Sequence, residues 1–498
     1  ANTDTASSAT AGECVAGDGA DTITFDSALN GSSITLAIAG RSEDANTTGD
    51  LDITSNIIIN GNGARNTIID AANIDRVFHI PSAVTVEINN VTIQNGDANL
   101  GGEDGGGLSI TNAGSDVTIN DSRFTGNAAT DDGGGIYLAQ GTLVINRSLI
   151  DNNSTAGSPD STGGGLTAFP GPGSTTINHT TITGNSASVA GGGVLAQSVQ
   201  LTLNHTTVTG NSAPATGGVR GQSILTNLQN SIVSGNTNGD CSNVDSFGYN
   251  LVGSSGNANG CPTDGSGDQI IAGVTSTIID PLADNGGGTD TFALASGSAA
   301  LDAIPNSTNG CNITNTEDQR GVARPQINGC DIGAFEAEPI PTVVISATDA
   351  DKAEGNTGTT AFTFTVDRTG NTAGITSADY AVTGSGVAPA NAADFGGTLP
   401  SGTVTFNATE TTQTIIINVS GDTTVELDEG FTVTLNNASG NAEINTTSAV
   451  GTIQNDDTDL EIGTTDAEKA EGNAGTTPFT FTVTRTGNID GIDRKSVV

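Results

Sequence analysis

The stretch VTINDSRFTGN at residues 117–127 decides the fold, because close copies of it return along the chain. These copies are LVINRSLIDNN (143–153), TTINHTTITGN (175–185) and LTLNHTTVTGN (201–211), with looser copies at 86–96 and 227–236. Glycine clusters lie between the copies, and those that begin at Gly105, Gly133, Gly163 and Gly191 are 28, 30 and 28 residues apart. A repeat of this length with two or three short strands predicts one coil of a parallel β-helix.

The apolar residues of the repeat predict how a coil is packed. Val117, Ile119 and Phe124 alternate with polar residues, so we expect them to point into a narrow core. Successive coils lie one strand spacing apart, about 4.8 Å, and equivalent residues therefore stack on one another. Hydrogen bonds along such a stack are expected for the turn asparagines Asn127, Asn153, Asn185, Asn211 and Asn236. The glycine clusters allow the backbone to turn sharply.

The repeat resembles the polymorphic outer-membrane-protein repeat, which has an F-x-x-N turn followed by GG and an aliphatic residue. The segment Phe124–Asn127 followed by Gly133–Ile136 is the best copy, and Ile or Val replaces the Phe in later copies. Residues 20–70 are similar to the opening coil of surface β-helices of this kind. We therefore expect residues 1–236 to form a right-handed parallel β-helix with an N-terminal coil.

The charge balance excludes several classes of partner. The 498 residues include 55 acidic and 14 basic side chains, a formal net charge of −41. Without a basic patch, binding to nucleic acid or to an anionic membrane is not expected, whereas solubility and divalent-cation binding are favoured. The sequence contains no stretch of 18 apolar residues, so it does not predict a transmembrane segment. The N-terminal ANTDTA is interpreted as a mature end left by an export signal, or as the edge of a fragment.

The cysteines point to an oxidising compartment. Cys241 lies near Cys261 in the sequence and Cys311 near Cys330, whereas Cys14 is alone. Two short-range pairs in a chain of this composition fit disulfides, with free thiols as the alternative.

A second motif, EDQRGVARPQINGCDIGAFE at residues 317–336, closely resembles the terminal motif of the choice-of-anchor Q family of exported bacterial β-helix proteins. The resemblance implies a secreted protein and a bridge between Cys311 and Cys330. Residues 237–338 are then the end of the β-helix and a disulfide-bearing cap, because an open β-helix end exposes strand edges. Arg320 and Arg324 could suggest an enzyme, because pectate lyases use an arginine as the catalytic base. We expect a structural role instead, with Arg320 paired to Asp318 or Asp331.

The C-terminal third contains a different repeat. ISATDADKAEGNTGTTAFTFTVDRTGN (345–371) returns almost unchanged at 462–488, which is 117 residues later. Alternation in FTFTV, GTVTF, TIIINV and FTVTL predicts the half-buried strands of an antiparallel, immunoglobulin-like sandwich. We expect one sandwich at 339–458 and a partial second one at 459–498. We expect the second copy to be incomplete because the chain is truncated. The alternative is that its strands complete the sheet of another chain.

This repeat resembles the Calx-beta domain at AEGN (353–356), AADF (392–395), GDTTVELDEGF (421–431) and GTIQNDD (451–457). In that family, carboxylates from these loops bind calcium at one end of the sandwich. The resemblance assigns this role to Glu354, Asp394, Asp422, Glu426, Asp456 and Asp457. Asn455 and Thr423 replace acids of the richest family members, so we expect one or two Ca²⁺ ions. An acidic rim without an ion is the alternative.

An enzyme is the competing class of function, because parallel β-helices also support pectate lyases and polygalacturonases. The acids that precede the glycine clusters are the candidates, since such enzymes need acids that converge on one groove. They are Glu103, Asp104, Asp131, Asp132 and Asp160. Solvated loop acids explain them equally well, and Trp, a common sugar-stacking residue, is absent. A second column, which includes His179 and His205, is expected to consist of exposed turn residues rather than a metal site.

Together these features predict an all-β chain with a β-helix, a Calx-beta sandwich and the start of a second sandwich. We expect a secreted or cell-surface structural or adhesion protein of bacterial type, and not an enzyme. The β-helix would be a stiff stalk, and calcium near the linkers of the sandwich would restrict bending. Expected partners are other surface or matrix proteins, glycans or further copies of the chain.

Overall fold

The computed structural model describes residues 21–40, 48–98, 103–157, 159, 161–169, 171, 173–197, 200–222, 226–253, 260–261, 265–271 and 275–488. The chain divides into two compact units, Ala1–Ala337 and Glu338–Val498. Nearly all regular structure is β, as the sequence predicts. The 3₁₀ helices η1 (Ser27–Leu29), η2 (Thr275–Thr277) and η3 (Ala393–Phe395) are single turns. Within the described residues, no helix is long and apolar enough to span a bilayer.

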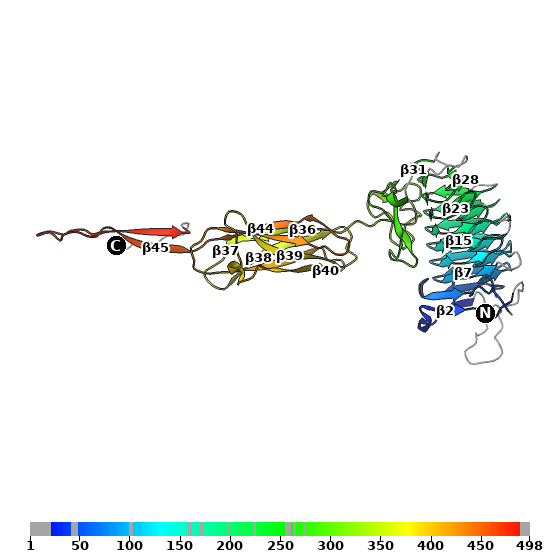
Figure 1. The fold of residues 1–498 in the computed structure, drawn as a ribbon, viewed down its shortest axis with the longest axis horizontal. Helices are drawn as coiled ribbons and strands as arrows, with labels where there is room; N and C mark the ends of the chain where they lie inside the picture. Colours follow the sequence, from blue (N-terminus) through cyan, green and yellow to red (C-terminus); the bar gives the residue numbers. More distant parts are fainter. Residues whose placement is uncertain are drawn as a thin grey trace. The chain divides into compact units, whose positions relative to one another are not determined.

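The first unit is the predicted parallel β-helix, in which each coil adds one parallel strand to each of three long sheets (Figure 1). Sheet A contains β1 (Asp21–Thr24), β4 (Ile57–Asn60), β7 (Thr85–Asn89), β11 (Asp116–Asn120), β15 (Thr142–Asn146), β19 (Ser174–Asn178), β23 (Gln200–Asn204), β26 (Thr226–Gln229) and β29 (Asp245–Ser246). Sheet B contains β2 (Ser32–Thr35), β5 (Thr67–Asp70), β8 (Thr92–Gln94), β12 (Arg123–Thr125), β16 (Leu149–Asp151), β20 (Thr181–Thr183), β24 (Thr207–Thr209), β27 (Ile232–Val233), β30 (Leu251–Gly253) and β31 (Gln269–Ile271).

Two further sheets complete the coils. Sheet C contains β3 (Leu51–Asp52), β6 (Phe78–Ile80), β10 (Leu108–Ile110), β14 (Ile136–Leu138), β18 (Leu166–Ala168), β22 (Val194–Ala196), β25 (Val219–Gly221) and β28 (Cys241–Ser242). The short sheet D contains β9 (Asp97–Ala98), β13 (Ala128–Ala129), β17 (Ser154–Thr155) and β21 (Ser186–Ala187). Parallel pairing continues through β28–β31, so the helical coils extend past residue 236 to Ile271.

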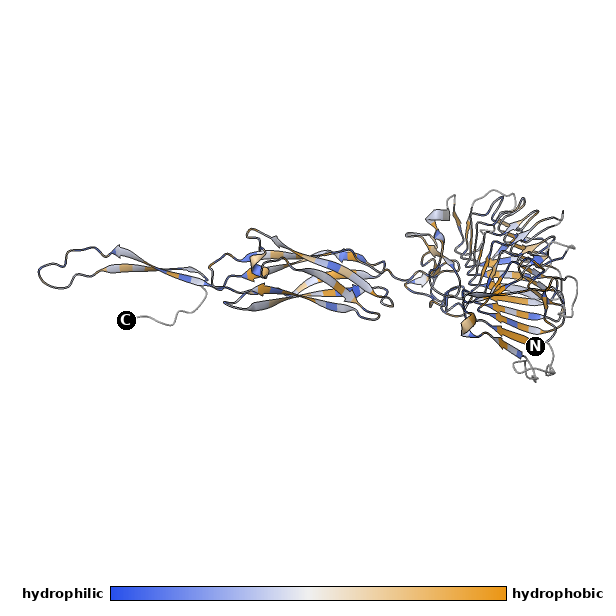
Figure 2. Cartoon of the chain, turned by 60° about the horizontal axis from the view of Figure 1, so that its bottom comes forward, coloured by the Kyte–Doolittle hydropathy of each residue, from blue (hydrophilic) through white to orange (hydrophobic). Residues whose placement is uncertain are grey.

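Stacked aliphatic side chains form the core of the β-helix, as the alternation predicts. Ile119 of β11 lies in register with Ile88 on one side and Ile145 on the other, and all three are fully buried. Phe124 occupies the same place in sheet B between Ile93 and Ile150. In Figure 2, hydrophobic positions recur on successive coils. Each coil thus buries its apolar side chains only against its neighbours.

The predicted asparagine ladder is present and buried. From Asn127 to Asn236, each side-chain Nδ2 donates to the Oδ1 of the next asparagine at 2.9–3.0 Å. The backbone N–H groups of Asn127, Asn153, Asn185 and Asn211 donate to the same Oδ1 atoms. The ladder ends on Asp240, whose Oδ1 accepts from Asn236 at 3.0 Å. Every acceptor in this dry stack therefore serves two donors, which makes the ladder costly to interrupt.

A second ladder, which the sequence analysis missed, runs along the half-buried edge of sheet A. It joins Asn60, Asn89, Asn120, Asn146, Asn178 and Asn204, mostly at 2.8–2.9 Å. Its donors point toward the N-terminus, opposite to those of the buried ladder. Asn204 also donates to Asn315, a residue of the segment that follows the coils, at 2.9 Å.

Residues 284–336, here called the flank segment, lie along the outer face of sheet B. Arg65 binds the carbonyl of Gly287 and the carboxylate of Asp290, at 2.8 and 2.7 Å. Farther along the sheet, Thr181 donates to Gln319, and the N–H of Ala334 donates to Thr207. This corrects the expectation of an end cap, because the segment covers the side of several coils. The hydroxyl groups of Thr181 and Thr207 on sheet B bind this segment directly.

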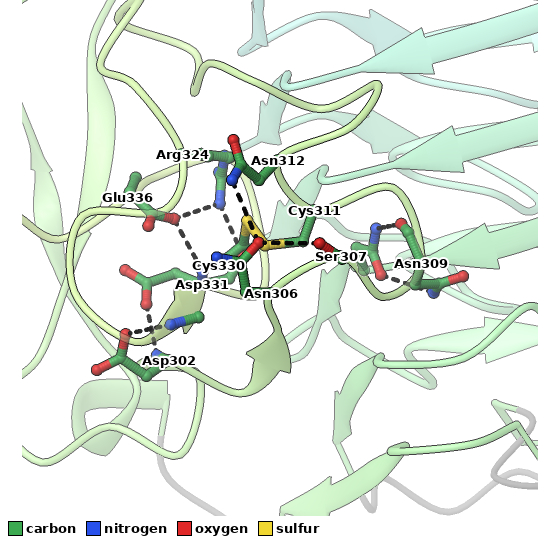
Figure 3. Close-up of a disulfide and its surroundings, with 12 residues drawn as sticks. Asp302, Asn306, Ser307, Asn309, Cys311, Asn312, Arg324, Cys330, Asp331 and Glu336 are labelled. Atoms are coloured by element: carbon green, nitrogen blue, oxygen red, sulfur yellow. Dashed lines mark hydrogen bonds and ion pairs between the residues drawn. A yellow bond between two sulfur atoms is a disulfide. The ribbon is translucent and has the colours of Figure 1, made fainter.

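Both predicted disulfides are present, Cys241–Cys261 and Cys311–Cys330, and the second closes the flank segment (Figure 3). Arg320 pairs with Asp318, as the sequence analysis proposed, at 2.8 Å. Arg324 is almost fully buried and pairs with Glu336 at 2.7 Å, while its other nitrogen donates to the carbonyl of Gly333. These contacts support a structural role for both arginines.

The second unit begins with a sandwich of two sheets. One sheet contains β36 (Thr342–Asp349), β38 (Thr359–Thr369), β41 (Thr412–Ser420) and β43 (Glu443–Thr446). The other contains β37 (Asp351–Ala353), β39 (Thr376–Ser385), β40 (Ser401–Phe406), β42 (Glu429–Asn436) and β44 (Ser448–Gln454). Phe431 lies in the core between the sheets and contacts three aromatic rings, those of Phe362, Phe364 and Phe395, at centroid distances of 5.5–5.8 Å.

The second copy of the repeat forms the hairpin of β45 (Thr458–Asp466) and β46 (Thr480–Gly487). Its pairing repeats that of β36 and β38, including a register shift at the equivalent place. Ile462 and Val483 are 68% and 63% exposed, whereas their counterparts Ile345 and Val366 belong to the sandwich core. The hairpin thus repeats the pairing of the first two long strands of the sandwich, and a second sandwich stays a prediction.

We predict that Asn185→Ala destabilises the β-helix by about 3 kcal/mol, because it leaves two buried donors of Asn153 without an acceptor. The matched change Asn178→Ala on the half-buried ladder should cost about 1 kcal/mol, since water replaces the lost amide. Urea unfolding of both variants measures the difference. Equal losses of unfolding free energy in the two variants would show that burial does not make the ladder more important for stability.

Candidate calcium site

One end of the sandwich gathers four acidic loops. They are the β37–β38 loop with Glu354, the turn η3 with Asp394, the β41–β42 loop with Asp422 and Glu426, and the segment after β44 with Asp456 and Asp457. Phe395 fixes η3 by packing on Phe431, which places the neighbouring Asp394 at this end. The linker 336–342 joins the sandwich near Gly370 and Asn371, at the opposite end of β38.

The carboxylates form two groups of three. In the first, single oxygen atoms of Glu354, Asp422 and Asp457 all lie within 4.8 Å of one another. In the second, the same holds for Asp394, Glu426 and Glu429. The six residues expected from the sequence therefore lie at one end of the domain, five of them in these two groups. Asp456 is close enough to raise the pKa of Glu354.

Glu429 is a member of the second group that the sequence analysis missed. It is the first residue of β42, two positions before the core residue Phe431. The sequence did contain a signal for Glu429. The residue belongs to the quoted motif GDTTVELDEGF and lies two positions before Phe431. The rule of alternation would have placed its side chain on the same face of β42 as that of Phe431.

Neutral donors hold these carboxylates in position without neutralising them. The Asn356 amide donates to Asp457 at 2.9 Å, the Asn391 N–H to Asp394 at 2.6 Å and the Thr424 N–H to Asp422 at 2.6 Å. Each of these bonds uses one carboxylate oxygen. Within each of the two groups, carboxylate oxygens still lie within 4.8 Å of one another.

Crowding and burial shift the pKa values of the acids upward. Burial raises the pKa of Glu354 to about 7, and repulsion from Asp422, Glu426, Asp394 and Asp456 adds to it. Burial and the neighbouring Asp394 raise the pKa of Glu429 to about 7. The pKa values of Glu426 and Asp457 are raised for the same two reasons. The site therefore favours a proton or a cation over free carboxylates.

Two buried oxygen atoms show that the site fits a hard cation. Oδ1 of Asp456 and Oδ2 of Asp457 are buried, and neither has a hydrogen-bond partner among the described residues. Buried carboxylate oxygens without donors are costly. Ca²⁺ binds six to eight oxygen ligands, and bidentate carboxylates, backbone carbonyls and water supply them in other proteins. The donor set here consists of carboxylate oxygens, which matches calcium better than a softer metal.

The acids of the β-helix form a separate group. Oxygens of Asp104, Asp131 and Asp132 lie within 4.8 Å of one another, at the turns that lead into sheet C. Burial, Asp104 and Asp131 raise the pKa of Asp132 to about 7, and the pKa of Asp104 is raised by burial. Glu103 is not a member of this group, and Asp160 and Cys14 lie outside the described residues.

The histidines differ from expectation. His205 is fully buried rather than exposed, and its ring stacks on that of His179 at 5.3 Å. Burial lowers the pKa of His179 to about 3, and the charge of Arg324 adds to this effect. The flank segment covers this position. The sequence of the repeat alone does not show this, because the flank segment lies far away in the chain. His79, which had no predicted partner, contacts Asp52 at 3.1 Å and Thr111 at 3.2 Å.

Residues 342–457 match the sequence profile of the Calx-beta domain. Similar solved structures include the apo-form Calx CBD1 domain, with 21% identity over 22% of this chain and 95% of that chain, at a TM-score of 0.19. The CBD12 structures from CALX1.2 and from CALX1.1, the latter titled a calcium binding domain, have 22% identity over 25% of this chain, at a TM-score of 0.20. The chain spans about half the length of the CBD12 structures (49%).

No curated protein matches the chain. The comparisons do not support the choice-of-anchor Q or polymorphic outer-membrane-protein resemblances, which stay predictions. The assignment of this domain rests on the sequence profile and on the sandwich itself. Residues 342–457 are a Calx-beta sandwich domain, which follows a parallel β-helix in the same chain.

Proposed function

We propose that the chain is a structural protein of the cell surface or extracellular matrix, with a β-helix as a stiff stalk and a sandwich that binds calcium. The two groups of carboxylates at one end of the sandwich carry this proposal. Two disulfides support an oxidising, extracellular location. Other surface proteins, matrix proteins, glycans or further copies of the chain are the proposed partners.

Calcium would act at the junction that follows the sandwich. Asp457 and Thr458 are consecutive, so the acidic end leads directly into β45. A cation that fixes Asp456 and Asp457 restricts the backbone at the start of the second copy. This refines the expectation from the sequence, because the linker 336–342 joins the opposite end of the domain.

We predict saturable calcium binding to the full chain in a calorimetric titration. Asp457→Asn should weaken the affinity at least about tenfold, because it removes charge from the oxygen that lacks a donor. Asp367→Asn is the matched control, since Asp367 lies near the other end of β38. Absence of calcium uptake, or an equal loss in both variants, would contradict the proposal.

The stability of the sandwich should depend on pH when calcium is removed by a chelator. The pKa values of Glu354 and Glu429 are raised to about 7 in the folded state, from 4.5. The folded state then binds more protons than the unfolded state between pH 4.5 and 7, so stability falls as pH rises through this range. We predict a melting temperature lower at pH 8 than at pH 5 by roughly 4 °C or more. Excess calcium should abolish this trend. If the calcium-free sandwich were more stable at pH 8 than at pH 5, the pKa assignment would be refuted.

A glycan-cleaving enzyme is the second candidate, favoured by the convergence of Asp104, Asp131 and Asp132. These carboxylates lie too close together for an inverting glycosidase. In such enzymes the two carboxyl groups are about 6.5–9.5 Å apart, which leaves room for the attacking water. It is nearer to the separation of about 5 Å in retaining enzymes. Asp132, whose pKa is raised to about 7, would be the general acid.

This alternative predicts cleavage of an acidic glycan such as polygalacturonate. Asp131→Ala should abolish the activity, whereas Asp116→Asn, a change of an exposed acid at the start of β11, should not. Release of reducing or unsaturated ends measures cleavage. An inactive wild-type chain would leave the structural proposal as the better account.

A further inference from the structure

The acidic end of the sandwich also borders a large open groove of about 1430 Å³. Its floor is the outer surface of β42 and β44, with Gly430, Thr432 and Thr452. The loops 385–388 and 425–428 line it further, and Gly487 and Asn488 lie at its rim. The groove lies entirely within the second unit.

Exposed aliphatic side chains line this groove. Val387 is fully exposed, and Leu427 and Val450 are 72% and 58% exposed. Each comes from a different element, namely the β39–β40 loop, the β41–β42 loop and β44. Exposed aliphatic side chains in a concave site offer apolar area that a bound chain can cover.

The charges in the groove define the chemistry of that chain. Glu426, Asp428 and Glu429 are the charged residues among the described residues that line it, and none of these described residues is Lys, Arg or His. Asp428 accepts the N–H of Asn455 but has no basic partner in the described structure. A ligand that combines aliphatic side chains with Lys or Arg complements both features.

A second copy of the chain fits this site poorly. The net charge of −41 makes two copies repel each other, and only 14 basic side chains are available. We therefore propose that the groove binds a peptide segment of another protein, in which Lys or Arg alternates with aliphatic residues.

We further infer that calcium and this segment compete, an inference that rests on the proposed calcium site. Glu426 and Glu429 line the groove and also belong to the second carboxylate group. A cation shared with Asp394 neutralises the two charges that attract the basic side chains. The segment binds when calcium is scarce and dissociates when calcium is abundant.

The test is calorimetric titration of the full chain with a short synthetic peptide of alternating lysine and valine, first in chelator and then in saturating calcium. We expect saturable binding in chelator and about tenfold weaker binding with calcium. The double variant Val387→Ser and Val450→Ser should lose at least about tenfold in peptide affinity and keep its calcium affinity. Ile416→Ser, which changes an exposed aliphatic residue of β41 outside the groove, should bind the peptide normally.

The outcomes separate this proposal from the calcium site. No saturable peptide binding in chelator overturns the docking proposal, whatever the calcium affinity is. Peptide binding that the double variant keeps shows charge attraction alone and also overturns it. Peptide binding that calcium does not weaken overturns the competition. Dimerisation that depends on Val387 would identify a second copy as the occupant and overturn the choice of partner.

Discussion

Repulsion among carboxylates at one end of the sandwich is the constraint on which the functional account depends. Seven acids converge there, six from four loops and Glu429 from the start of β42: Glu354, Asp394, Asp422, Glu426, Glu429, Asp456 and Asp457. The loops approach one another because the sandwich core, centred on Phe431, fixes the strands that carry them. Packing free energy thus maintains an electrostatic arrangement that is unfavourable alone. Protons relieve the strain at low pH, and a divalent cation relieves it at neutral pH.

The β-helix shows a different solution to the burial of polar groups. Its asparagines satisfy one another along the stack, so the buried ladder needs no ligand. Arg324 and Glu336 in the flank segment likewise form a buried pair. At the acidic end of the sandwich, by contrast, Oδ1 of Asp456 and Oδ2 of Asp457 are buried and have no donor among the described residues. This contrast within one chain distinguishes polar groups that stabilise the fold from those that are available for binding.

Features that repeat or alternate could be predicted from the sequence. The stacking of Ile119, the ladder through Asn185 and the convergence of Glu354 with Asp457 follow from periodicity or from the Calx-beta resemblance. The contacts that the flank segment makes with the coils could not be predicted. The burial of His205 depends on the flank segment, whose path across sheet B no local pattern specifies. Glu429 was missed because it lies on a strand rather than in a loop, although strand alternation with Phe431 indicates its direction.

Diffraction from crystals grown with calcium tests the central claim most directly, because anomalous scattering locates the ion without assumptions about affinity. The account predicts anomalous peaks between Glu354, Asp422 and Asp457, between Asp394, Glu426 and Glu429, or in both places. It also predicts that the Asp457 carboxylate oxygen without a donor is a ligand or bonds to a water molecule bound to the ion. Density without a peak at this end of the sandwich, in a crystal saturated with calcium, would contradict the account.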